Sequence, residues 1–127
     1  MMRFVILMIA LPLFAFQQSA SSSMASITRA MSSGNATAVG THFDDNVELS
    51  LPSEDGIYGK AKAVEKLNQF FGQHTIKGFS QVHEGSSKGN AAKYCIGNLQ
   101  TDKGNFRVYM FVEVDQNRYS LQELRIE

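Results

Sequence analysis

The sequence predicts an α+β domain in which helices cover one face of a curved antiparallel sheet. Three observations support this fold class. Helical periodicity occurs only before Gly72. One short hairpin, at about residues 46–58, interrupts this helical part. From about Ile76 onward, the chain consists of strand-like runs separated by turn residues. The last of these runs changes the parity of its apolar positions, which is typical of a β-bulge and therefore of a bent strand.

Residues 1–20 are predicted to be a cleaved signal peptide. Arg3 precedes an apolar run from Phe4 to Phe16, and a short exit segment ends at Ala20. The run is shorter than the ~20 residues that a membrane-spanning helix needs. No cysteine follows it closely, so we expect no lipid anchor. The expected protein is exported, periplasmic or secreted, with no stable membrane anchor after cleavage; an uncleaved anchor is the alternative.

The remaining residues, 21–127, are predicted to form one domain without a repeat or linker. The whole chain has 127 residues, with 12 basic and 12 acidic side chains, so its formal net charge is zero. This balance argues against nucleic acid as a partner, because such binding needs a clustered basic excess. Cys95 is the only cysteine and cannot form an intrachain disulfide. We expect it to be a buried, inert thiol in a strand; a reactive or intermolecular thiol is the alternative.

Three helices are expected in the first half of the chain. The first begins after the serines at 21–23 and ends at Gly34, with apolar residues at helical spacing: Met24, Ile27 and Met31. Asn35 is expected to cap the second helix, although the segment 35–37 also matches a glycosylation sequon. Gly59 is expected to precede the third helix and Gly72 to end it. The apolar face of this third helix carries Ala63, Val64, Leu67, Phe70 and Phe71.

Strands are expected on both sides of the third helix. Residues 46–51 alternate apolar and polar side chains, and a turn at 52–56 leads into a short return strand at Ile57 and Tyr58. Turn clusters at 86–90, 102–105 and 115–118 divide the segment after Ile76 into four long strands of an antiparallel meander.

The segment 106–114 predicts an unusual sheet surface. One parity is fully apolar: Phe106, Val108, Met110, Val112 and Val114. The other parity carries Arg107, Tyr109, Phe111 and Glu113. Two large rings on this second face indicate that it, too, is covered by something. The pattern leaves open which of the two faces meets the helices. In the last strand, one extra residue near Gln122 and Glu123 would restore the register.

Several stretches together resemble a small, exported, uncharacterised family typical of Bacteroidota, within the nuclear-transport-factor-2-like superfamily. That superfamily includes ketosteroid-isomerase-like, SnoaL-like and scytalone-dehydratase-like proteins. The stretches are SGNATAV at 33–39, HFDDNVEL at 42–49, GIYGKAKAVEKLNQFF at 56–71, VHEGSSKGN at 82–90, YCIGNLQT at 94–101, GNFRVYMF at 104–111 and LQELRIE at 121–127. The resemblance implies a cone-like sheet wrapped around helices, often with a pocket at its open end and often paired as a homodimer through the sheet.

The sequence supports a catalytic site less strongly than it supports the fold. An isomerase-like site would need a carboxylate base and a proton donor such as tyrosine. The tyrosines are at 58, 94, 109 and 119, the mid-strand carboxylates are at 84, 113 and 123, and Asp44 and Asp45 follow the second helix. No local motif assigns a catalytic role to any of them. His83 and Glu84 begin like a zinc-protease motif, but the fifth residue is Ser87 and the segment is strand-like. We therefore expect no metal site and no cofactor.

The leading expectation is a non-catalytic binding module. It would hold a small apolar ligand in the cone or an envelope protein partner across the sheet, and it would form a homodimer. The candidates for the pocket or interface are His42, Asp44, Tyr58, Phe71, His83, Tyr94, Tyr109 and Phe111. One alternative is a cofactor-free isomerase or dehydratase with a tyrosine and carboxylate acid–base site. A second is a structural envelope component.

Overall fold

A computed structural model describes residues 23–127. The predicted signal peptide, residues 1–20, lies outside the described residues. The helices are α1 (Met24–Ser33), α2 (Ala36–Gly40) and α3 (Lys60–Gln73). The strands are β1 (Phe43–Leu51), β2 (Glu54–Gly59), β3 (Ile76–Ser86), β4 (Ala92–Thr101), β5 (Gly104–Asp115) and β6 (Arg118–Ile126). The predicted order of helices, hairpin, helix and four long strands is confirmed.

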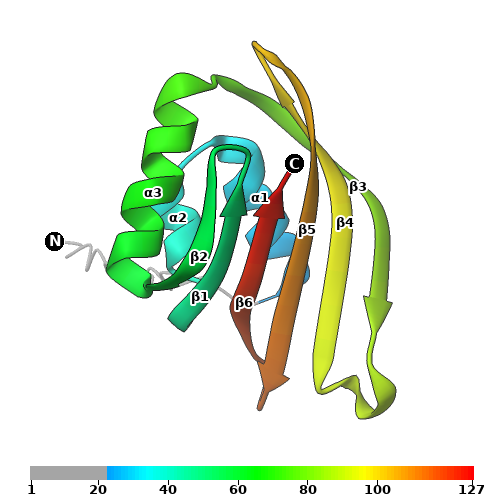
Figure 1. Cartoon of the computed structure of the whole chain (residues 1–127). Coiled ribbons are helices and arrows are strands. Elements are labelled where there is room, and N and C mark those ends of the chain that lie inside the picture. Colours follow the sequence, from blue (N-terminus) through cyan, green and yellow to red (C-terminus); the bar gives the residue numbers. More distant parts are fainter. Residues whose placement is uncertain (1–22) are drawn as a thin grey trace, which may run out of the picture.

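The six strands form one curved sheet in the order β2-β1-β6-β5-β4-β3. All neighbouring strands are antiparallel except β1 and β6, which pair in parallel. Figure 1 shows α1 and α2 behind the sheet and α3 beside β1 and β2. The face turned toward the viewer carries no helix, and we call it the outer face.

The apolar parity of β5 meets the helices. Val108, Met110 and Val112 are fully buried, whereas Phe106 and Val114 are partly buried. The fully buried partners of this layer come from the helices and neighbouring strands: Ile27, Met31, Val39, Val47, Leu49, Leu67, Cys95, Leu99, Leu121, Leu124 and Ile126. These side chains fill the space between helices and sheet along most of the strand length. Burial of this layer is therefore the main source of stability.

The predicted bulge lies in β6. Phe111 pairs with Glu123 and Val112 pairs with Leu121, so Gln122 has no partner on β5. This extra residue allows both Leu121 and Leu124 to point into the core although they differ in parity. The same displacement puts Glu123 on the outer face, next to Phe111.

The helix ends follow the predicted caps with one exception. The hydroxyl of Ser23 accepts a hydrogen bond from the Ser26 amide at 3.1 Å, and Gly34 ends α1 with a left-handed φ of 66°. The prediction that Gly72 ends α3 was wrong, because the helix continues to Gln73. The ring of His74 stacks on Phe70 at 4.2 Å, and its Nδ1 lies 2.9 Å from the Phe70 carbonyl oxygen. This contact places a side-chain nitrogen at a carbonyl of the last helical turn, where side chains can supplement the backbone hydrogen bonds.

We expect Asn35→Ala to lower the free energy of unfolding by about 1 kcal/mol. The Asn35 side-chain oxygen accepts a hydrogen bond from the Ala38 amide at 3.1 Å, so its loss leaves that amide without its cap. Urea unfolding followed by circular dichroism measures the change. Asn35→Ser, which retains a capping oxygen, is the control and should lose much less. Equal losses in the two variants would contradict a capping role.

Candidate binding surface

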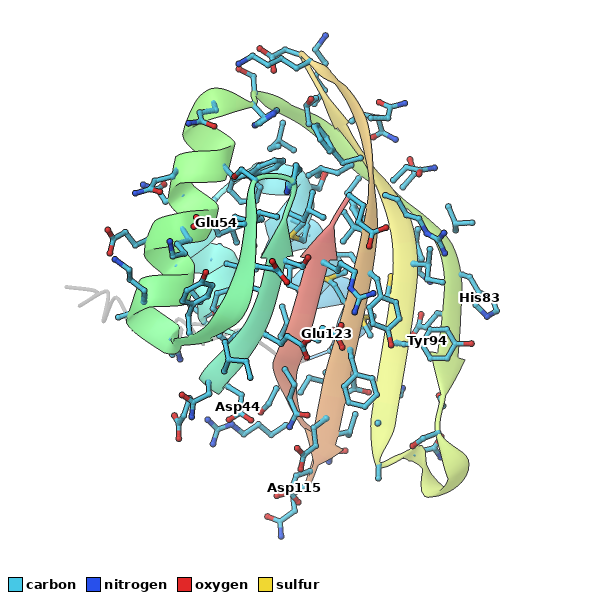
Figure 2. All side chains as sticks on the ribbon, viewed as in Figure 1. Asp44, Glu54, His83, Tyr94, Asp115 and Glu123 are labelled. Carbon is cyan, nitrogen blue, oxygen red and sulfur yellow. The ribbon has the colours of Figure 1, made fainter. Side chains whose placement is uncertain are left out.

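Ring side chains gather on the outer face over three adjacent strands. Tyr94 of β4 pairs with Phe111 of β5, and Ile96 pairs with Tyr109 on one side and His83 of β3 on the other. Because side chains alternate along a strand, these paired residues point to the same face. Figure 2 shows His83 and Tyr94 side by side on the face without helices. We call the five residues the ring cluster: His83, Tyr94, Ile96, Tyr109 and Phe111.

Direct contacts hold the rings in place. His83 Nε2 lies 3.0 Å from the Tyr94 hydroxyl oxygen, and the rings of Tyr94 and Tyr109 stack with centroids 6.5 Å apart. The Tyr94 ring also covers the backbone of Gly85, where an added Cβ would come within 2.3 Å of ring atoms. The absence of a side chain at Gly85 therefore allows the Tyr94 ring to lie over β3.

Charged side chains flank the ring cluster on the β6 side. The Arg125 guanidinium lies 5.8 Å from the Tyr109 ring centroid, a cation–π contact, and 2.6 Å from a carboxylate oxygen of Glu123. Desolvation by burial raises the pKa of the Tyr109 hydroxyl, and the negative charge of Glu123 raises it further. Tyr109 is therefore a neutral hydrogen-bond donor at physiological pH.

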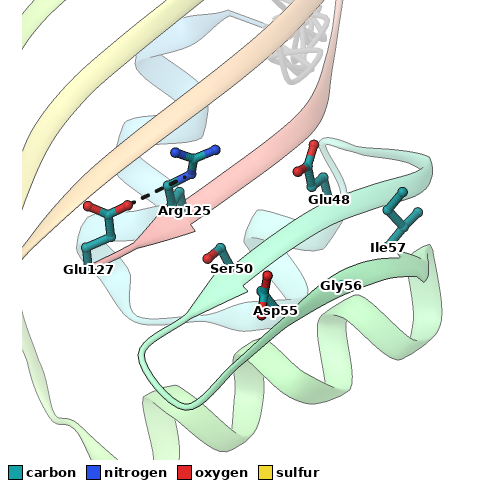
Figure 3. A pocket seen from close by; sticks show the side chains of 7 residues that line it. All are labelled: Glu48, Ser50, Asp55, Gly56, Ile57, Arg125 and Glu127. Carbon is teal, nitrogen blue, oxygen red and sulfur yellow. Dashed lines mark ion pairs between the residues drawn. The ribbon is translucent and has the colours of Figure 1, made fainter.

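Two shallow hollows lie on either side of Arg125 and Glu127. The first has a volume of about 230 Å³ and opens between β2 and the end of β6, as Figure 3 shows. The second has a volume of about 170 Å³ and is lined by Arg107, Tyr109, Arg125 and Glu127. Each is smaller than the ~300 Å³ at which ordinary small-molecule pockets begin. Their linings are mostly polar, so they resemble depressions in a binding surface more than a ligand pocket.

The structure brings half of the predicted site residues together. His83, Tyr94, Tyr109 and Phe111 belong to the ring cluster, whereas the other four are dispersed. His42 lies before β1, where burial and then the charge of Lys60 lower the pKa of its ring. The side chain of Asp44 accepts a hydrogen bond from Gln122 at 3.3 Å.

The other two dispersed candidates have structural contacts. Tyr58 packs under the ammonium of Lys66, 5.0 Å from its ring centroid, and that ammonium also pairs with Glu54 at 2.9 Å. Phe71 belongs to the hydrophobic core. Ile96 and Arg125 were missed as site residues. Their positions in the sequence indicate which face of a strand each occupies. Only the register between strands shows that both lie next to Tyr109.

The helix-covered side of the sheet offers little room for a ligand or an acid–base site. Its centre is filled by the fully buried apolar layer. Among the side chains that the structure describes, Thr101 is the only buried polar one, so none of the described carboxylates has the buried setting of a catalytic acid. The described residues also contain no group of three or more histidine, cysteine or acidic side chains placed to hold a metal ion.

Cys95 lies in the core, where desolvation by burial, and then the charge of Glu84, raise the pKa of its thiol to about 11. The folded state therefore favours the neutral thiol, and stability falls as the pH rises above the reference value of 9.0. We expect wild-type protein to lose roughly 2 kcal/mol more than Cys95→Ala between pH 8 and pH 10.5. Urea titrations at both pH values measure this difference. An identical pH dependence in the two proteins would contradict it.

Comparison with known proteins identifies the family of this chain. A family model described as "Domain of unknown function (DUF4783)" matches residues 24–127. The chain belongs to the DUF4783 family. The predicted resemblance to an uncharacterised family is thereby confirmed.

Solved structures of DUF4783 proteins are similar to this chain. One, from Bacteroides ovatus, is 29% identical, covers 84% of this chain and 94% of its own, and has a TM-score of 0.75. Another, from Bacteroides uniformis, is 28% identical, covers 84% and 96%, and has a TM-score of 0.76. An NTF2-like protein of unknown function from Cytophaga hutchinsonii is 11% identical, covers 81% and 83%, and has a TM-score of 0.52, which supports the fold alone.

The nuclear-transport-factor-2-like fold class is therefore confirmed for this DUF4783 chain. The comparison with curated proteins gives no match. Within residues 23–127, no helix combines the length and apolarity needed to cross a membrane.

Proposed function

We propose that this DUF4783 protein is an exported, non-catalytic binding module that docks a protein partner on the outer face of its sheet, and that a second copy of the chain is that partner. The observation that carries the proposal is the ring cluster. It places two tyrosines, a phenylalanine, an isoleucine and a histidine on a face that no described element covers.

The composition of this face fits a protein interface. Tyrosine, phenylalanine and arginine are enriched at the centres of such interfaces, and rigid rings contribute large contact areas at low entropic cost. Tyr94, Tyr109 and Phe111 are half-buried in the single chain and held by their neighbours. They are therefore already ordered for contact, which lowers the cost of association.

Two features support this form of binding over the alternatives. The filled centre of the helix-covered side disfavours a ligand in the cone. None of the described carboxylates is buried, although Asp44, Glu54 and Glu123 are partly buried, and this disfavours a cofactor-free isomerase or dehydratase. Export rests on the predicted signal peptide, and no feature of residues 23–127 bears on it.

A small apolar ligand is the second candidate, at a different place from the one expected. A mostly apolar groove with a volume of about 650 Å³ lies between α2 and α3, lined by Thr37, Gly40, Thr41, Lys60, Ala61 and Val64. This volume is within the range of small-molecule sites. Its wide opening to solvent makes it a weaker candidate than the ring cluster.

Sedimentation equilibrium of the chain without residues 1–20 tests the proposed function. Concentrations from about 0.1 to about 100 µM cover the affinities of weak and moderate dimers. We expect the mass of two chains at the upper end and dissociation on dilution. The mass of one chain at every concentration would overturn the proposal of a second copy.

A further inference from the structure

The charges of the outer face follow a gradient along the strands. On β5, Arg107 stands at one end, Tyr109 and Phe111 in the middle, and Glu113 at the other end. On β6, Arg125 pairs with Tyr109 and Glu123 pairs with Phe111, so this strand has the same order from positive to negative. On β1, Glu48 pairs with Glu123 and adds a further carboxylate to the negative end.

Only a few orientations let two copies of this face meet with two-fold symmetry. The axis of such a pair lies in the plane of contact, because each copy presents the same surface to the other. An axis along β5 would place Arg107 against the partner's Arg107 and Glu113 against the partner's Glu113. An axis along the strands between β4 and β5 would place Arg107 against the partner's Asn98, and Glu113 against the partner's Ala92, without pairing opposite charges.

An axis across the strands gives a different result. If it passes at the level of Met110, each strand runs antiparallel to the same strand of the partner. Arg107 then faces the partner's Glu113, and Arg125 faces the partner's Glu123. Symmetry doubles each contact, so four pairs of opposite charge surround the ring cluster. Tyr94 faces the partner's Ile96, Tyr109 faces the partner's Phe111, and Glu127 faces the partner's Ser120, so no like charges meet.

We infer that two chains associate in this orientation, with the two-fold axis across the strands at the level of Met110. The inference rests on the proposed function and specifies the geometry of the partner. Two sheets packed face to face keep their strands within about 30° of alignment, which preserves the contacts close to the axis. Charge complementarity at the rim selects the orientation, while the rings provide most of the contact area.

Charge reversal tests the orientation. Arg107→Glu alone would place two acidic side chains opposite each other, and Glu113→Arg alone would place two basic ones opposite each other. We expect each single variant to raise the dimer dissociation constant about tenfold or more. The double variant Arg107→Glu with Glu113→Arg restores opposite charges and should return to within about threefold of the wild type. An equimolar mixture of the two single variants should form the mixed dimer selectively.

Two control variants make the same types of charge reversal on the helices instead of on the outer face. Arg29→Glu on α1 and Glu65→Arg on α3 are exposed and lie away from the outer face, so neither should alter the dissociation constant. Sedimentation at low ionic strength provides the measurement. A dimer that is insensitive to both single reversals, or a double variant as weak as the single ones, would overturn the orientation and leave the dimer itself intact. A wild-type monomer would instead overturn the proposed function.

Discussion

Tyr109→Lys combined with Phe111→Lys is expected to convert the two-chain form into single chains. Both rings lie at the centre of the ring cluster, and each lysine would introduce a charge that the partner's ring cannot solvate. Residues at such positions commonly contribute about 2 kcal/mol or more each. The combined loss corresponds to a dissociation constant raised about 1,000-fold. Sedimentation at about 10 µM should therefore show the mass of one chain, where wild-type protein shows two.

The control introduces the same charge on a helix, as Ala25→Lys. Ala25 is exposed on α1, behind the sheet and away from the outer face, so its replacement should leave the dimer unchanged. Unfolding of the double variant must remain cooperative, which shows that monomers do not result from misfolding. An unchanged sedimentation coefficient in a folded double variant would count against the outer face as the interface.

Leu121→Ala is expected to cause the largest loss of stability. Leu121 is fully buried on β6, paired with Val112 of β5 and with Phe43 of β1. Strands on both sides hold the site open, so the cavity left by the substitution can collapse only in part. Such changes cost about 2–5 kcal/mol. We expect a melting temperature at least about 10 °C lower, measured by calorimetry.

Val82→Ala provides the comparison for Leu121→Ala. Val82 is also a branched aliphatic residue in a strand, but its side chain is 64% exposed. The free energy of unfolding of the Val82→Ala variant should differ from that of the wild type by no more than about 0.5 kcal/mol. Similar losses in the two variants would contradict the assignment of Leu121 to the core.

Much of the fold was predictable because its local signals agree. The alternation from Phe106 to Val114 identified two distinct faces, and burial of Val108, Met110 and Val112 shows which one meets the helices. The parity change in the last strand correctly predicted a bulge, located at Gln122. These features depend on residues close together in the chain, where periodicity is informative.

The parts that were not predicted depend on distant residues. The parallel pairing of β1 with β6 joins segments separated by about seventy residues, and no local pattern encodes it. The ring cluster likewise required the register of β3, β4 and β5. Arg125 became part of the surface only because the bulge and this register place it beside Tyr109. The end of α3 differs from the prediction by one residue, because Gly72 lies inside the helix and Gln73 ends it.

Native mass spectrometry of the protein, purified from its own cells without denaturation, tests the central claim most directly. The account predicts the mass of two chains, each lacking the signal peptide, with no additional small molecule that is lost on denaturation. The same preparation of Tyr109→Lys with Phe111→Lys should give the mass of one chain. A single wild-type chain that carries a small molecule would contradict the account and favour a ligand carrier instead.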